Sequence, residues 1–156
     1  LAPFLLRSGF DTAEITDAWG LALRLLPVTD DRLRTMVTLA GSGEEVRVDR
    51  EVLRAALQRA AILSNEKYRG VKLELSPGQL RIVAHNPEQE EAEEEVEAET
   101  RVDGLAVGFN VTYLLDALTA LREEHVVINL RDGNSSALIR EASHERSRHV
   151  VMPLRL

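Results

Sequence analysis

The chain has 156 residues, the size of one domain or of one domain with a small appendage. Its 44% hydrophobic and 29% charged residues exclude a disordered chain. A net charge of -7 excludes a surface that grips nucleic acid over its whole face. The absence of cysteine excludes disulfides, thiolate metal sites and cysteine nucleophiles. No apolar run has the length of a membrane span, and the first ten residues lack a signal-peptide pattern. We therefore expect a cytoplasmic protein that does not contact a membrane.

The first 44 residues are predicted to form a segment of their own. Asp11 with Glu14 offers a helix start, and Pro27 would end that helix. The apolar residues between them follow a helical spacing, at Ile15, Trp19, Ala22 and Leu26. A strand is expected at Leu33–Leu39, and residues 40–43, Ala-Gly-Ser-Gly, are typical of a linker.

Residues 45–156 are predicted to form one domain with an internal repeat. The first block is a strand, a helix and three strands, at Glu45–Asp49, Arg50–Ala61, Gly70–Leu75, Gln79–Ala84 and Ala92–Arg101. The second block has the same order, at Leu105–Asn110, Val111–Arg122, Val126–Arg131, Ser135–Glu141 and His149–Leu156. Two strand-helix-three-strand repeats, with helices on one face of antiparallel sheets, predict an α+β fold.

Nothing in the sequence indicates an enzyme. His85, His125, His144 and His149 show no metal-ligand spacing and no acidic partner at helical distance, which favours surface or strand histidines. The serines lack a nucleophile-elbow context, and residues 41–43 have neither the length nor the lysine of a phosphate loop. The sequence therefore predicts no catalytic group, no metal site and no cofactor.

Three surface patterns each admit two interpretations. The glutamates between Glu88 and Glu95 could protect an edge strand from pairing, or they could dock a basic partner. Arg50, Arg54 and Gln58 form a helical stripe, which by default is a solvated face. The tail from His149 to Leu156 could be a buried strand or, with its Met-Pro-Leu-Arg-Leu ending, an adaptable binding surface.

Three strings in the chain resemble a known family. They are AAILSNEKYRGVKLELSPGQLRIVAHNPEQEEAEEEV at 60–96, FNVTYLLDAL at 109–118 and VVMPLRL at 150–156. These strings resemble the third domain of the bacterial sliding clamp, the beta subunit that keeps the replicative DNA polymerase on its template. The resemblance spans Val46 to Leu156 and implies a DNA-clamp (processivity) fold for residues 45–156. Residues 1–44 stay unassigned: a divergent remnant, an unrelated appendage, or an element that caps an exposed face.

The resemblance implies three sets of site residues. The third-domain side of a peptide pocket would comprise Tyr68, Asn110, Tyr113, Asn134, Ser136, Val150, Val151, Met152, Pro153, Leu154 and Arg155. Asn134 stands where the family usually has an aliphatic residue, so this pocket would be more polar. The subunit interface of the ring would comprise Ile62, Leu63, Glu88, Glu90, Glu91, Glu93 and Glu94. The residues that face DNA in the hole would be Arg50, Arg54, Gln58 and Arg122.

The implied function is binding. As a processivity factor, the domain would bind short hydrophobic motifs of polymerase, clamp-loader and repair proteins, and would encircle duplex DNA only within a closed ring. Two alternatives stay open. One is a truncated clamp relative that acts as a regulator, by capturing clamp-binding peptides or by pairing with a full-length clamp. The other is a structural DNA-binding protein that forms rings as a homo-oligomer.

Overall fold

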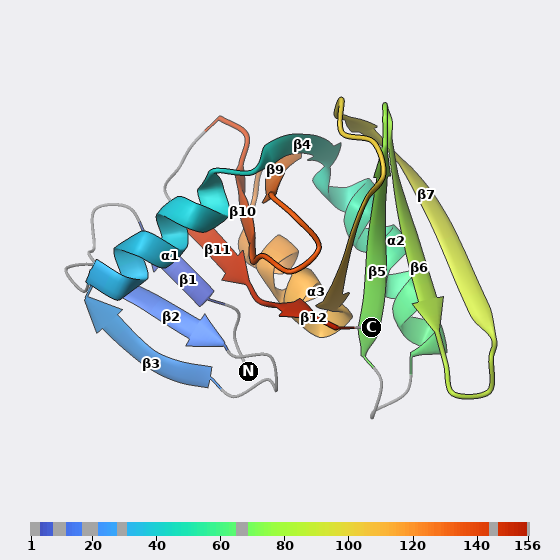
Figure 1. Cartoon of the computed structure of the whole chain (residues 1–156), viewed down its shortest axis with the longest axis horizontal. Helices are drawn as coiled ribbons and strands as arrows, with labels where there is room; N and C mark the ends of the chain where they lie inside the picture. The colour runs from blue at the N-terminus through green and yellow to red at the C-terminus, as the bar shows by residue number, and fades with distance from the viewer. Residues whose placement is uncertain are drawn as a thin grey trace.

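The computed structural model describes residues 4–7, 12–16, 22–27, 31–64, 69–143 and 147–155. Its strands form one antiparallel sheet in the order β12-β8-β5-β6-β7-β4-β9-β10-β11-β1-β2-β3 (Figure 1). The strands are β1 (Phe4–Arg7), β2 (Thr12–Thr16), β3 (Ala22–Pro27), β4 (Glu44–Asp49), β5 (Gly70–Ser76), β6 (Gln79–His85), β7 (Glu91–Glu99), β8 (Leu105–Asn110), β9 (His125–Leu130), β10 (Ala137–Glu141), β11 (Ser147–Val151) and β12 (Pro153–Leu154). The helices are α1 (Asp31–Gly41), α2 (Arg50–Leu63) and α3 (Val111–Ala120).

The predicted repeat is present. A strand, a helix and three strands run from β4 to β7, and the same order recurs from β8 to β11. Each helix starts directly after its strand at a capping side chain: Asp49 accepts a bond from Val52 N, and Asn110 accepts one from Thr112 N, both at 2.9 Å. The halves are joined by two strand pairs, β4 with β9 and β5 with β8.

Helices α2 and α3 pack against each other and cover one face of the sheet. Each contributes an apolar stripe, which is Leu53, Ala56, Leu57 and Ala60 in α2 and Leu114, Ala117 and Leu118 in α3. These side chains are buried with strand residues such as Phe109 and Ile128 in one cluster. Full burial of a leucine stabilises the fold by about 1.5–3 kcal/mol, so this cluster dominates the stability of the domain.

Helix α1 covers the opposite face of β9 and β10. It contacts both strands, and its buried residues Val37 and Ala40 lie outside the main cluster. Strand β9 alternates between the two layers: Ile128 belongs to the main cluster, whereas Val127 is buried on the side away from it. Cover on both faces explains why β9 is a nearly continuous apolar run. Among the described helices, none is long and apolar enough to cross a membrane.

The helix and the strand predicted in the first 44 residues are wrong. Residues 12–16 and 22–27 form strands β2 and β3, which pair with each other. Trp19 lies outside the described residues. Among the described strands only β1 connects β2 and β3 to the rest of the sheet, by pairing with β11, a strand more than 100 residues away. This sheet pairing overrides the helical spacing. The predicted strand Leu33–Leu39 is part of helix α1 instead. Val37 is 7% exposed and Leu39 50%, although strand alternation would place both on one face.

The predicted linker at 40–43 is almost absent, because α1 ends at Gly41 and β4 begins at Glu44. The glycine at 43 serves close packing. A Cβ there would come within 2.4 Å of the backbone carbonyl carbon of Leu130 in β9. The Cβ of an alanine at Gly41 would meet only the end of the Leu138 side chain, at 3.1 Å.

The C-terminal strand is split in two, whereas a single strand was predicted from His149. Strand β11 ends at Val151 and pairs with β10, and β12 pairs with β8 at the other end of the sheet order. Met152 is the residue between them, so the chain passes from one part of the sheet to another at that point. Pro153 is tolerated because β12 is an edge strand with one neighbour.

Candidate functional site

The tail and the start of helix α3 form one surface. Pro153 of β12 lies opposite Phe109 and Leu154 opposite Gly108, so the tail runs beside the end of β8, where Asn110 begins α3. Met152, Pro153 and Leu154 are half-buried. Ser136 comes from the loop before β10, and its hydroxyl donates a 3.1 Å hydrogen bond to the Met152 sulfur. Apolar side chains and a few polar groups therefore come together at this end of the sheet.

The other predicted pocket residues differ in exposure. Val150 and Val151 are fully buried, and Tyr113 is nearly so, so these three offer little accessible surface to a peptide. Asn134 and Arg155 are exposed, and Tyr68 lies outside the described residues. The loop that carries Asn134 is held by Asp132, whose carboxylate accepts bonds from Asn134 N at 2.9 Å and Ser135 Oγ at 2.8 Å. These bonds lower the pKa of Asp132 below its ordinary value.

The predicted interface residues lie at the far end of helix α2 and along β7. Ile62 is 85% exposed, whereas Leu63 is half-buried and packs against the main cluster. Glu91, Glu93 and Glu94 belong to β7, and Glu88 and Glu90 to the turn before it. In that turn Asn86 Oδ1 accepts bonds from the backbone amides of both glutamates. An exposed apolar residue with acidic neighbours is therefore present.

Two of these glutamates already have cationic partners within the chain. Arg59 of α2 donates to both carboxylate oxygens of Glu94, at 3.0 and 2.9 Å, and this bidentate contact lowers the pKa of Glu94. Arg81 of β6 pairs with Glu93 on the other face of β7. Glu88, Glu90 and Glu91 make no contact with a Lys or Arg of the described chain among the ion pairs found.

Most of β7 is an open edge. It pairs with β6 along its length, but with β4 only at Glu99 and Ala98. Within the described part of the chain no other strand pairs with residues 91–97 on that side. The backbone groups of this stretch are thus available to another strand, with charged side chains that discourage random pairing.

The predicted DNA-facing residues are on or beside the helices, but they are not equivalent. Arg50 has a structural role: its side chain is 17% exposed and donates to the carbonyls of Glu123 at 2.9 Å and Leu118 at 3.3 Å. Arg54 is paired with Glu51 at 3.1 Å. Gln58 and Arg122 are exposed. The helical face therefore offers phosphates few unengaged cations.

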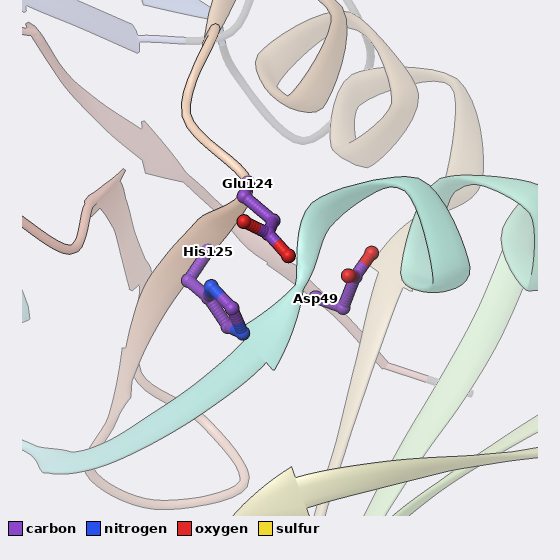
Figure 2. A group of neighbouring side chains, drawn as sticks. All are labelled: Asp49, Glu124 and His125. Atoms are coloured by element: carbon purple, nitrogen blue, oxygen red, sulfur yellow. The ribbon is translucent and has the colours of Figure 1, made fainter.

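One group of potential metal ligands was not predicted from the sequence. Asp49, Glu124 and His125 bring their ligand atoms within 4.8 Å of one another (Figure 2). No acidic partner at helical distance from His125 indicates this group, because Asp49 and His125 are 76 positions apart and meet by cross-strand pairing. The internal repeat was the available signal in the sequence. It relates β4 and β9 as strands of two packed halves, and their pairing brings Asp49 at the end of β4 beside His125 at the start of β9.

Residues 40–155 match the family model of the DNA polymerase III beta subunit, C-terminal domain. The chain belongs to this sliding-clamp family. The match covers the tail, helix α3 and strand β7, which are the elements of the two surfaces described above. It does not include the first 39 residues.

The similar relatives are beta sliding clamps. Identity is 54% over 116 residues with that of Pseudomonas putida, 56% over 116 residues with that of Pseudomonas aeruginosa, and 50% over 106 residues with that of Escherichia coli K12. The aligned part is 74% of this chain for the first two and 68% for the third. It is 32%, 32% and 29% of those relatives, so the chain matches about a third of a complete sliding clamp.

Solved clamp structures resemble more of the chain. A DNA polymerase sliding clamp from Pseudomonas aeruginosa matches with a TM-score of 0.76 and 45% identity, over 98% of this chain and 41% of that one. A sliding clamp from Bartonella birtlesii matches with a TM-score of 0.74 and 28% identity, over 94% of this chain and 40% of that one. The mixed helix and antiparallel-sheet fold is thereby confirmed, and the structural similarity extends into the segment before residue 40.

Proposed function

We propose that this chain acts as the C-terminal part of a sliding clamp, which is a binding role rather than a catalytic one. In this role it presents one side of a pocket for short hydrophobic motifs of polymerase and clamp-loader proteins. It supports processivity when it is part of a closed ring around duplex DNA. The proposal rests on the half-buried stretch Met152-Pro153-Leu154, which lies beside the start of α3.

The chemistry of that surface supports the proposal. Met and Leu side chains give an apolar, adaptable wall, and Asn110 and Ser136 give polar anchors at its border. A peptide with two apolar residues fits this combination better than a charged ligand does. Because the chain matches about a third of its relatives, it supplies only part of a composite pocket. Binding should therefore be weak, with Kd on the order of 0.1–1 mM.

Titration of a fluorescently labelled peptide with two apolar anchors into the full chain tests this. Met152→Ala and Leu154→Ala remove exposed apolar surface without removing β12, so the fold should survive and binding should fall at least several-fold. Val52→Ala is the matched control, since Val52 is half exposed on helix α2. Equal binding by all three variants, with unchanged circular dichroism, would reject the pocket.

A second candidate is supported by the open edge of β7 and the exposed Ile62. In this role the chain pairs with a full-length clamp and regulates it, with Glu88, Glu90 and Glu91 meeting cations of the partner. Mixing the chain with a full-length clamp and measuring the mass of the complex separates the two roles. A mixed species that Ile62→Lys abolishes, together with intact peptide binding, favours the regulator.

A further inference from the structure

The group formed by Asp49, Glu124 and His125 includes no residue of the predicted peptide pocket or of the predicted subunit interface. Asp49 ends β4 and His125 begins β9, directly opposite it in the antiparallel register. Glu124 is the residue before His125. Figure 2 shows the three side chains grouped where the first half of the internal repeat meets the second. Asp49 and His125 are half-buried and Glu124 is exposed, so a small ligand can reach the group from solvent.

The backbone that carries these residues is fixed by hydrogen bonds. Arg50 N donates to the carbonyl of Glu124 at 2.8 Å, and Ala142 N donates to the carbonyl of His125 at 3.2 Å. Asp49 caps helix α2 through Oδ1, which holds its carboxylate in place while Oδ2 is a second oxygen that could bind a ligand. A group held in this way loses little conformational entropy on binding.

The surroundings favour a cation. Asp49 and His125 line a hollow of about 700 Å³, and Glu95, Glu97 and Glu99 of strand β7 line the same hollow. The lining carries one arginine, Arg47, and four carboxylates, and Glu124 adds a fifth carboxylate beside Asp49 and His125. The balance of charge is therefore negative where the three ligand atoms meet.

We propose that Asp49, Glu124 and His125 bind one divalent transition-metal cation of the zinc or manganese class. Two carboxylates with one imidazole suit such ions, whereas magnesium and calcium prefer all-oxygen sites. Three protein ligands leave positions for water. The site joins the end of β4, the first strand of the first half-repeat, to the start of β9 in the second half, so the bound ion stabilises the contact between these two strands. The site shares no residue with the predicted peptide pocket, and its hollow borders the open edge of β7.

Isothermal titration calorimetry of the full chain with zinc, manganese and magnesium chlorides tests the site. One zinc or manganese ion should bind per chain, more tightly than magnesium, and should raise the unfolding temperature. Manganese should broaden the NMR signals of residues 49, 124 and 125 first. Glu124→Gln, His125→Gln and Asp49→Asn should each weaken binding by roughly tenfold or more, since the loss even of outer ligand partners costs ~10–100-fold.

Two features keep the test decisive. Asparagine caps helices as well as aspartate does, so Asp49→Asn removes a charge and keeps the fold. His85→Gln is the matched control, because His85 is an exposed histidine 4.0 Å from a single carboxylate, that of Glu91. It should leave binding unchanged. The proposal is overturned by the absence of a one-to-one site, by equal binding in all three variants, or by line broadening centred on other residues.

Discussion

Neighbouring glutamates of β7 have different roles because strand side chains alternate between faces. Glu94 points to α2 and is bound by Arg59, and Glu93 points away from it and is bound by Arg81. A partner that binds these two residues must compete with arginines of the same chain. The glutamates of the preceding turn, and Glu91, carry the charge that is most available to an incoming cation.

The pKa of Glu94 gives a direct test of this arrangement. The bidentate bond from Arg59 lowers it in the folded state. The resulting stability is present above the pKa of the unfolded chain and is lost as pH falls through the folded pKa. Arg59→Gln should raise the pKa of Glu94 toward its ordinary value and reduce the pH dependence of stability in acid. Carboxyl NMR titration measures the pKa of Glu94, and urea unfolding at several pH values measures the stability. Arg81→Gln, which affects Glu93, should leave the Glu94 titration unchanged.

At the scale of elements, Arg50 connects the start of α2 to the end of α3. Its backbone amide donates to Glu124, and its guanidinium donates to the carbonyls of Glu123 and Leu118. Carbonyls at the C-terminal end of a helix have no partner within that helix. A cation at this end also interacts favourably with the helix dipole. The side chain at the head of the predicted DNA-facing stripe therefore stabilises the packing of two helices.

The effect of an Arg50 substitution on stability should show the structural role of this side chain. Arg50→Ala removes two hydrogen bonds from a largely buried guanidinium and should lower the free energy of unfolding by about 1–3 kcal/mol. Arg54→Ala, one turn away and paired only with exposed Glu51, should change it by less than about 0.5 kcal/mol. Urea unfolding of both variants measures the difference. Equal effects would mean that Arg50 is an ordinary surface residue.

Local sequence patterns predicted elements well where a helix or strand and its partners lie close in the chain. The capped helices after Asp49 and Asn110, and the hairpin around Gly78, which has φ of +79°, follow from such patterns. The helix predicted from Asp11 was wrong because β2 and β3 join the sheet through β1, whose partner β11 lies near the other end of the chain. The break at Met152 and the group around His125 were not predicted either, because both arise from pairing between strands that are distant in the sequence.

At the scale of the whole molecule, the N-terminal strands lie away from the predicted interface patch. Strands β1 to β3 extend the sheet beyond β11, on the side opposite β7 in Figure 1. The sequence left open whether the first 44 residues cover the interface patch. With Ile62 at 85% exposure, the described part of that segment leaves it uncovered. The patch is therefore free for a second copy or for a full-length clamp.

The last prediction concerns that patch. Ile62→Lys should abolish any self-association of the chain, because it places a charge at the apolar centre of the proposed contact, where it would be buried without a partner. The free energy of unfolding should change by less than about 0.5 kcal/mol, since the side chain is exposed in the monomer. Leu57→Ala is the matched control: Leu57 is fully buried on the other face of the same helix, and its truncation should cost about 2–5 kcal/mol. Sedimentation equilibrium and urea unfolding on both variants decide the outcome. Association that persists in Ile62→Lys would place the contact elsewhere, and loss of the fold would show that Ile62 is covered in solution.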